Sequence, residues 1–201
     1  MNSNEYEIIM NSRKLIKSQN EEEKSKGLAL LEDLANQRNK YALYELALLY
    51  KEGIYVEKNI KKACNLFVFS GELGNNKSFY DVGKIFLENK DYDTAKRYFE
   101  KAKFSPQAFF ELGKMAYYGK GINQSSHKAF SYFYSASKLG CPEADYFLAE
   151  AFILGNGIGV DSKKGIYYLK RALRKGIKDK AHLQKIIETN RKGDKIFNSI
   201  N

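Results

Sequence analysis

Hydrophobic and small residues recur along this chain in a fixed order that predicts a series of similar helices. Each copy begins with a small residue: Gly27, Ala63, Ala95, Ala129 or Gly165. Four residues later comes a large apolar residue: Leu31, Phe67, Phe99, Phe133 or Leu169. Seven residues after the start comes Leu34, Ser70, Ala102, Ala136 or Ala172. Spacings of three, four and seven put these side chains on one helical face, and copies about 32 to 36 residues apart are typical of stacked helical repeats.

The borders of these helices carry their own signals. A residue that can cap a first helical turn lies four positions before the small residue in four copies: Asn59, Asp91, Ser125 and Asp161. A glycine that can adopt the left-handed conformation follows three of the helices: Gly74, Gly140 and Gly176. We therefore predict helices such as residues 91–103 and 125–139.

A second helix is predicted before each of these. Its start is marked by Ala42, Ser78, Ala108 and Ala144, and a further small residue follows five positions later. Two residues into each of these helices stands an aromatic residue: Tyr44, Tyr80, Phe110 or Tyr146. The small residues allow two helices to approach closely. Glycine-containing loops join the two helices at residues 53–56, 119–122 and 155–158, whereas the remaining repeat is shorter there.

This combination of small residues, glycine loops, caps and aromatic residues resembles the Sel-1-like repeat (SLR) family, a longer-looped relative of the tetratricopeptide repeat. Residues 42–77, 108–143 and 144–178 match its pattern well, and residues 78–107 resemble a plain tetratricopeptide repeat. Residues 5–41 resemble a degenerate first repeat in which only the second helix is clear. Residues 179–192 resemble a capping helix with Leu183, Ile186 and Ile187 on its apolar side, and residues 193–201 form a tail.

The predicted fold is an all-α, right-handed α-solenoid of about five helix-turn-helix repeats with a C-terminal capping helix. We expect one continuous domain over residues 1–201, because each repeat buries its apolar face only against its neighbours. No stretch is long and apolar enough for a membrane span, and the first residues lack the apolar core of a signal peptide. A cytoplasmic location, or export by a route that needs no signal peptide, is therefore expected. Two isolated cysteines, Cys64 and Cys141, fit a reducing compartment.

Residues that could carry catalysis have simpler interpretations. The segment 155–159 superficially resembles a phosphate-binding loop, but no predicted strand precedes it, no Gly-Lys-Ser/Thr follows, and a similar loop occurs 36 residues earlier. His127 and His182 belong to no cluster with metal-ligand spacing, and His127 is expected to face solvent. Glu143 and Glu150 lie seven apart, which predicts a solvated helix face rather than a catalytic pair. We expect no catalytic residue, no metal and no cofactor.

The resemblance implies a groove lined by the first helix of each repeat, in which a protein or peptide partner binds. The positions expected to be exposed there are Leu48, Lys51, Lys84, Leu87, Lys114, Tyr117, Glu150 and Ile153. The aromatic residues Tyr44, Tyr80, Phe110 and Tyr146 border this surface, either as packing residues or as partly exposed contacts. Lys84 and Lys114 occupy equivalent positions and could hold an acidic group if they converge.

Charge is unevenly distributed. The formal net charge is +10, and residues 163–201 hold 12 Lys and Arg against 3 Asp and Glu. This basic end is either a solvated cap, a surface for an acidic protein, or a site for nucleic acid or anionic membrane. Tyr167 and Tyr168 are expected to serve the core.

Three hypotheses on function follow. The first is a non-enzymatic protein–protein interaction module or adaptor. The second is an immunity or inhibitor protein for a cognate secreted bacterial toxin, a role that members of the resembled family have. The third is a binder of nucleic acid or an anionic surface through the basic end, and nucleic acid is the less favoured partner. The oligomeric state stays open.

Overall fold

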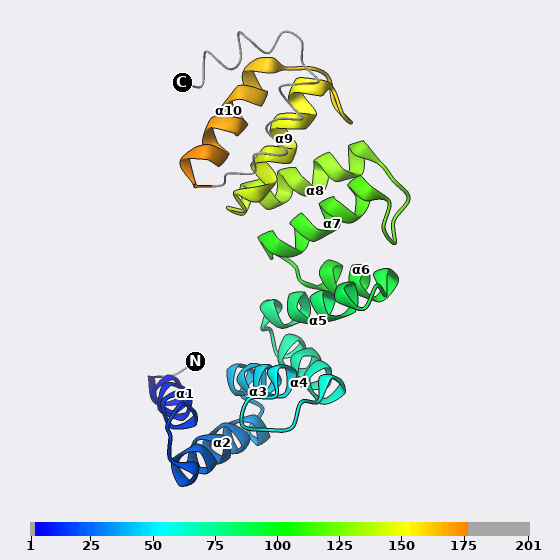
Figure 1. The fold of residues 1–201 in the computed structure, drawn as a ribbon. Coiled ribbons are helices and arrows are strands. Elements are labelled where there is room, and N and C mark those ends of the chain that lie inside the picture. The colour runs from blue at the N-terminus through cyan, green and yellow to red at the C-terminus, as the bar shows by residue number, and fades with distance from the viewer. Residues whose placement is uncertain (1–2, 177–201) are drawn as a thin grey trace. The chain divides into compact units, whose positions relative to one another are not determined.

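The computed structural model describes residues 3–176, which form ten helices and no strand (Figure 1). The helices are α1 (Ser3–Ile16), α2 (Glu21–Asn36), α3 (Lys40–Glu52), α4 (Ile60–Glu72), α5 (Asn76–Glu88), α6 (Tyr92–Lys101), α7 (Pro106–Tyr118), α8 (Ser126–Lys138), α9 (Glu143–Leu154) and α10 (Ser162–Arg174). The all-α repeat class predicted for the chain is confirmed. The predicted capping helix at residues 179–192 and the tail at 193–201 lie outside the described residues.

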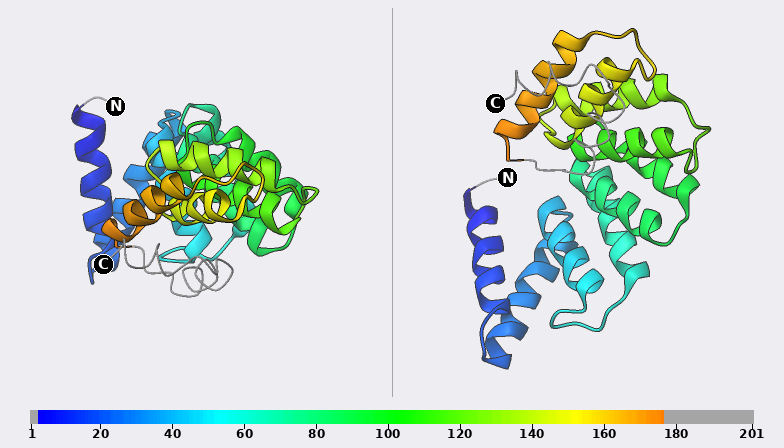
Figure 2. Two further views of the ribbon diagram at one scale, coloured as in Figure 1. Left: turned by 90° about the horizontal axis from the view of Figure 1, so that it is seen from above. Right: turned by 45° about the horizontal axis from the view of Figure 1, so that its top comes forward.

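The chain divides into two compact units, Met1–Ile85 and Phe86–Asn201, and the boundary between them falls within α5. In the first unit, α1 packs on α2, α2 on α3, and α3 on α4. In the second unit, α6 packs on α7, α7 on α8, α8 on α9, and α9 on α10 (Figure 2). Odd-numbered helices are thus the first helices of the repeats and even-numbered helices the second. The single continuous solenoid stays a prediction.

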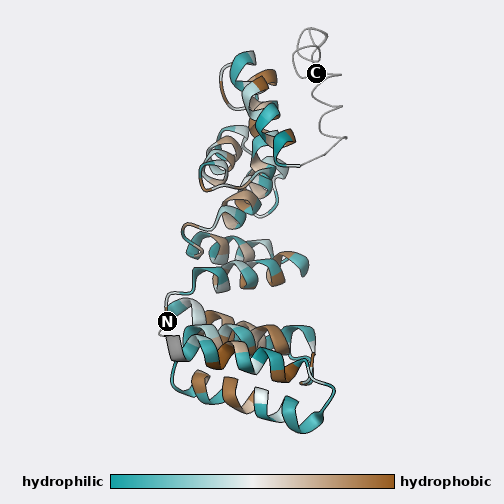
Figure 3. Ribbon diagram, turned by 90° about the vertical axis from the view of Figure 1, so that its left-hand side faces the viewer, coloured by the Kyte–Doolittle hydropathy of each residue, from teal (hydrophilic) through white to brown (hydrophobic). Residues whose placement is uncertain are grey.

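Most helices are amphipathic, with hydrophobic and hydrophilic residues alternating at helical spacing (Figure 3). The small residue of each copy is buried, and so is the large residue four positions later, as the spacing predicted. Close approach explains why the small residues are needed. A Cβ atom added to Gly113 in α7 would lie 2.6 Å from the ring of Phe133 in α8.

Helix ends follow the predicted capping residues. The side chains of Asn59, Asp91, Ser125 and Asp161 accept hydrogen bonds of 2.8 to 3.3 Å from backbone N–H groups three residues ahead. Gly74, Gly140 and Gly176 have positive φ angles of 91°, 95° and 80°, as expected for residues that end helices. The interpretation of the glycine segment near residue 155 as a connector is also confirmed, because it joins α9 to α10.

The N-terminal repeat is more complete than the sequence indicated. A first helix, α1, precedes α2, and its residues Ile9, Ser12 and Ile16 are buried. Gly27 of α2 lies against the backbone oxygen of Ser12 and the side chain of Ile16. The first repeat is therefore a full helix pair.

Candidate partner-binding surface

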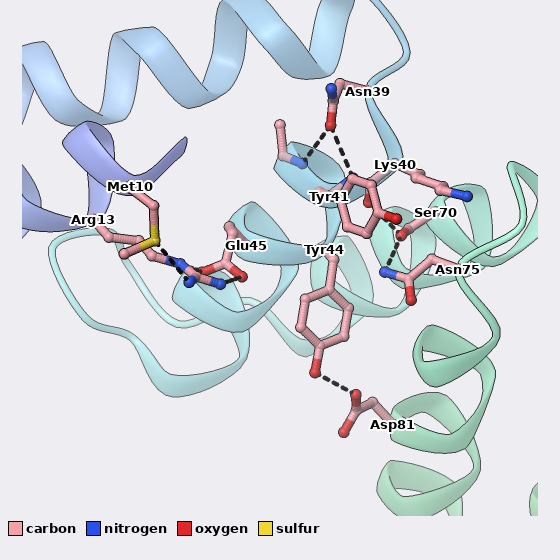
Figure 4. A network of polar contacts seen from close by, with 11 residues as sticks. Met10, Arg13, Asn39, Lys40, Tyr41, Tyr44, Glu45, Ser70, Asn75 and Asp81 are labelled. Atoms are coloured by element: carbon pink, nitrogen blue, oxygen red, sulfur yellow. Dashed lines mark hydrogen bonds and ion pairs between the residues drawn. The ribbon is translucent and has the colours of Figure 1, made fainter. Parts of the chain in front are cut away.

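In the first unit, the predicted surface residues lie on α3 and α5. Tyr44 is buried, and Tyr80, Lys51 and Lys84 are half-buried. The Tyr44 hydroxyl of α3 donates a 2.8 Å hydrogen bond to Oδ2 of Asp81 in α5 (Figure 4). Tyr44 therefore joins two consecutive first helices, and its aromatic ring packs 5.4 Å from that of Phe67 in α4.

Burial controls the protonation of this pair. It raises the pKa of the Tyr44 phenol, and the hydrogen bond to Asp81 raises it further, so the phenol stays a donor. Burial also raises the pKa of Asp81, and this rise is opposed by the bond from Tyr44 and by the charges of Lys51 and Lys77. Lys51, one of the predicted surface residues, thus also stabilises the charged form of the half-buried Asp81 carboxyl group.

A hollow of about 350 Å³ opens beside α3 in the same unit. Apolar side chains from α1, α2, α3 and the following loop line most of it: Ile16, Leu31, Leu48, Leu49, Ile54 and Tyr55. Charged side chains complete the lining: Arg13, Lys17, Glu45 and Glu52. Ile54 and Tyr55 are exposed large hydrophobic residues. The hollow therefore combines an apolar lining with charges of both signs.

An ion pair fixes one wall of this hollow. Arg13 Nε in α1 donates to Glu45 Oε2 in α3 at 2.8 Å, and a second guanidinium nitrogen donates to Oε1 (Figure 4). Two parallel bonds hold a guanidinium and a carboxylate in one plane. Sequence reasoning found Leu48 but missed Arg13 and Glu45, because α1 was not recognised. The buried positions Ile9, Ser12 and Ile16 lie at helical spacing, but the polar Ser12 interrupts the hydrophobic pattern.

In the second unit, Lys114 borders a hollow of about 230 Å³. Leu87, Tyr92, Tyr118 and Lys120 line it as well. Lys114 Nζ lies 2.7 Å from Glu111 Oε2 and 5.0 Å from the ring centre of the half-buried Phe110. The side chain of Lys114 thus contacts residues of its own helix, α7. Since Lys84 and Lys114 belong to different units, their convergence stays a prediction.

The predicted exposure of Glu150 and Ile153 is wrong. Glu150 is 1% exposed and Ile153 4%, and nearly every residue of α9 is buried. Ile153 occupies the space beside Gly165 of α10, where no Cβ stands. Glu150 Oε1 accepts a 3.0 Å hydrogen bond from the hydroxyl of the half-buried Tyr117. The expectation of a solvated face for Glu143 and Glu150 holds for Glu143 alone, which is exposed.

Aromatic packing fills this part of the surface. Tyr146 is 2% exposed, which places it among the packing residues. The rings of Phe133 and Phe147 stack with centres 4.3 Å apart, and Tyr117 lies 5.6 Å from Phe147. Only about 10 Å³ of free space remains between Tyr117, Phe147 and Glu150, about enough for one water molecule. Open hollows do border first helices at Leu48 and at Lys114.

Other candidates for chemistry were also located. His127 is exposed, as expected. Within residues 3–176, no group of three or more His, Cys, Asp or Glu is placed to hold a metal ion. No helix in the same range is long and apolar enough to cross a membrane. Tyr168 is half-buried against the core, but Tyr167 is 53% exposed, so its expected core role is wrong.

Comparisons with known proteins agree with this architecture. The Sel1 repeat family matches residues 40–75, 72–103, 106–141 and 142–177. Chitin synthase regulatory factor 1 of Schizosaccharomyces pombe is 30% identical over 146 residues, which cover 67% of this chain. The match spans only 31% of that relative.

Two solved structures share the fold. A Sel1 repeat protein from Oxalobacter formigenes aligns with a TM-score of 0.68 at 23% identity, over 74% of this chain and 63% of that one. A protective antigen of uropathogenic Escherichia coli with an SLR fold aligns with a TM-score of 0.70 at 23% identity, over 87% of this chain and 39% of that one. The four family matches cover more than half of the sequence, and the chain belongs to the Sel1 repeat family.

Proposed function

We propose that this protein is a non-enzymatic interaction module that binds a segment of a partner protein on its first helices. The observation that carries the proposal is the hollow beside α3, where an apolar lining is bordered by charges of both signs. Apolar pockets with a polar rim accept the anchor side chains that dominate protein interfaces. A partner would insert an apolar side chain near Leu48 and place polar groups against Lys17 and Glu52.

The rigidity of the hollow supports this function. Its walls are helices, and the Arg13–Glu45 pair joins α1 to α3. A surface that is already ordered loses little conformational entropy on binding. Lys51, Lys84 and Tyr80 on the first helices of the same unit are further candidate contacts. The hollow at Lys114 is a separate candidate contact in the second unit.

The relative named as a chitin synthase regulatory factor is consistent with action through binding rather than through catalysis. The match spans less than a third of that protein, so we take from it only this mode of action. Cys64 and Cys141 are both free thiols, which fits a reducing compartment. We therefore expect the module to work as an adaptor in the cytoplasm.

Site-specific photo-crosslinking tests the proposal. A photoreactive amino acid replaces Leu48 in one variant, Lys114 in a second and Lys61 in a control, where Lys61 is an exposed residue of the second helix α4. Each variant is irradiated in cells, and the adducts are identified by mass spectrometry. One shared protein captured from positions 48 and 114 but not from 61 would support the proposal. The same adducts at all three positions would contradict it.

A further inference from the structure

Five aromatic rings form a continuous series across the last two repeats. Tyr134 stacks on Phe130 in α8, with ring centres 6.1 Å apart, and Phe130 contacts Phe152 of α9 at 5.4 Å. Phe152 stacks on Tyr168 of α10 at 5.6 Å, and Tyr168 contacts Tyr167 at 5.4 Å. The middle of the series is buried at Phe152, whereas its ends, Tyr134 and Tyr167, are 38% and 53% exposed.

Positive charges accompany this series. Lys138 lies 5.3 Å from the ring centre of Tyr134, and Lys164 lies 5.5 Å from that of Phe152. The Arg171 guanidinium lies 4.9 Å from the ring of Tyr168. Three cations of the last two repeats thus lie beside rings of this series.

The second helices of the last two repeats, α8 and α10, contain no acidic residue. Helices α8 and α10 hold only cations among their charged side chains: Lys128, Lys138, Lys163, Lys164, Lys170, Arg171 and Arg174. The other second helices mix both signs, since α2, α4 and α6 all include Asp or Glu. Of the nearby acids, Asp145 is buried against Arg171, and Asp161 caps α10 and pairs with Lys164. Lys138, Lys163 and Arg174 stay exposed.

We propose that the exposed face of α8 and α10 binds an acidic segment of a partner protein. This face is a second surface, separate from the first-helix surface described above. Carboxylates would pair with the exposed Lys138 and Arg174 and with the half-buried Lys170. The exposed Tyr134 and Tyr167 would contact the neighbouring side chains of the segment. Tyrosine and arginine are the residue types enriched at the energetic centres of protein interfaces.

The rings favour a peptide over nucleic acid. Single-stranded nucleic acids bind by stacking bases on free aromatic faces. Phe130, Tyr134 and Lys138 are spaced four residues apart on one ridge of α8, so the Tyr134 ring lies between the Phe130 ring and the lysine. Both ring neighbours of Tyr134 thus come from its own helix, which leaves less of its faces free for a base.

Fluorescence anisotropy with defined probes tests the proposal. The probe is a labelled peptide of alternating Glu and Tyr, about ten residues long, which spans roughly 30 Å when extended. A single-stranded oligothymidine of similar length is the second probe. The full chain is compared with the variant Lys138→Glu/Lys170→Glu/Arg174→Glu and with Tyr134→Ala/Tyr167→Ala. A control, Lys14→Glu/Lys61→Glu/Lys103→Glu, makes the same charge change at exposed positions elsewhere.

The peptide should bind the unaltered chain and the control alike. The charge-reversed variant should bind it at least about tenfold more weakly, since three attractive contacts become repulsive, and the tyrosine variant should also bind it more weakly. Equal losses in the control and the charge-reversed variant, or no peptide binding at all, would overturn the proposal. Tighter binding of the oligonucleotide, lost only in the charge-reversed variant, would make this a nucleic-acid surface and overturn the peptide assignment. Circular dichroism confirms that each variant is folded.

Discussion

The Tyr44 hydroxyl donates a 2.8 Å hydrogen bond to Asp81, so an aromatic residue of one repeat is joined to a carboxylate of the next. Tyr117 and Glu150 form the same kind of link between α7 and α9 in the second unit, at 3.0 Å. Both bonds connect consecutive first helices. These tyrosines therefore hold neighbouring repeats together. Fewer aromatic residues on this face are then available to contact a partner.

Replacing Tyr44 by Phe should destabilise the first unit. The ring packing stays, but the half-buried carboxyl group of Asp81 loses its donor, which costs about 1 to 2 kcal/mol. Asp81→Asn should cost less than Tyr44→Phe, because an amide oxygen still accepts the bond and the burial that raises the pKa of Asp81 no longer opposes a charge. Urea unfolding followed by circular dichroism measures both. Equal stability of Tyr44→Phe and the unaltered chain would show that the bond contributes nothing.

Gly113→Ala should be destabilising even though alanine favours helices by about 1 kcal/mol over glycine. The added Cβ would lie 2.6 Å from the Phe133 ring, and overpacking typically costs about 1 to 3 kcal/mol. Phe133→Leu in the same chain should relieve the overlap, so the double variant should be more stable than the sum of the single changes allows. Thermal unfolding of the four proteins gives this coupling, and simple additivity would refute the close contact.

Arg171→Met should strongly destabilise the second unit. Asp145 is fully buried and accepts a 2.6 Å hydrogen bond from Arg171 Nε, while another guanidinium nitrogen contacts Ser137. Removing one partner of a buried ion pair typically costs about 3 to 5 kcal/mol, because the remaining charge is uncompensated. Lys170→Met, the adjacent change, should have a small effect. Similar melting temperatures for the two variants would contradict this account of the pair.

Asp161→Asn should change how stability depends on pH. Hydrogen bonds from the backbone and side chain of Lys164 hold the pKa of Asp161 below its ordinary value of 3.8. A lowered folded pKa gives stability that is present above the unfolded pKa and lost as pH falls through the folded pKa. The asparagine keeps the cap without the charge. The stability difference between the two proteins should therefore be largest at neutral pH and shrink below about pH 4. A stability difference between the two proteins that does not change with pH would contradict the lowered pKa of Asp161.

Much of the fold could be predicted because small residues mark where helices touch. A small residue followed four positions later by a large apolar one, such as Ala63 and Phe67, recurs in each repeat. Capping residues such as Asp161 mark where the helices start. Helix α1 was missed because its buried positions include Ser12, whose hydroxyl bonds to the backbone of Ile8 and needs no polar partner elsewhere. A pattern of hydrophobic residues alone does not reveal such a position.

The candidate surface was harder to predict, because exposure depends on which side chains of the neighbouring repeat fill the space. Glu150 and Leu48 were both expected to be exposed, yet Glu150 is buried among Tyr117 and Phe147, whereas Leu48 lines an open hollow. Tyr167 shows the reverse case, since it was assigned to the core and is exposed. Corresponding positions in different repeats thus differ in exposure, because different neighbouring side chains pack around them.

The most direct test of the central claim uses the partner identified by crosslinking. Calorimetry measures its affinity for the unaltered chain and for the variant Leu48→Glu. A carboxylate at position 48 would place a charge in the apolar lining near Glu45 and Glu52. We predict at least a tenfold loss of affinity, about 1.4 kcal/mol, whereas Asn65→Glu, the same charge change at an exposed position of α4, should bind like the unaltered chain. Equal affinity of Leu48→Glu and the unaltered chain, with both variants folded, would contradict binding at the first-helix hollow.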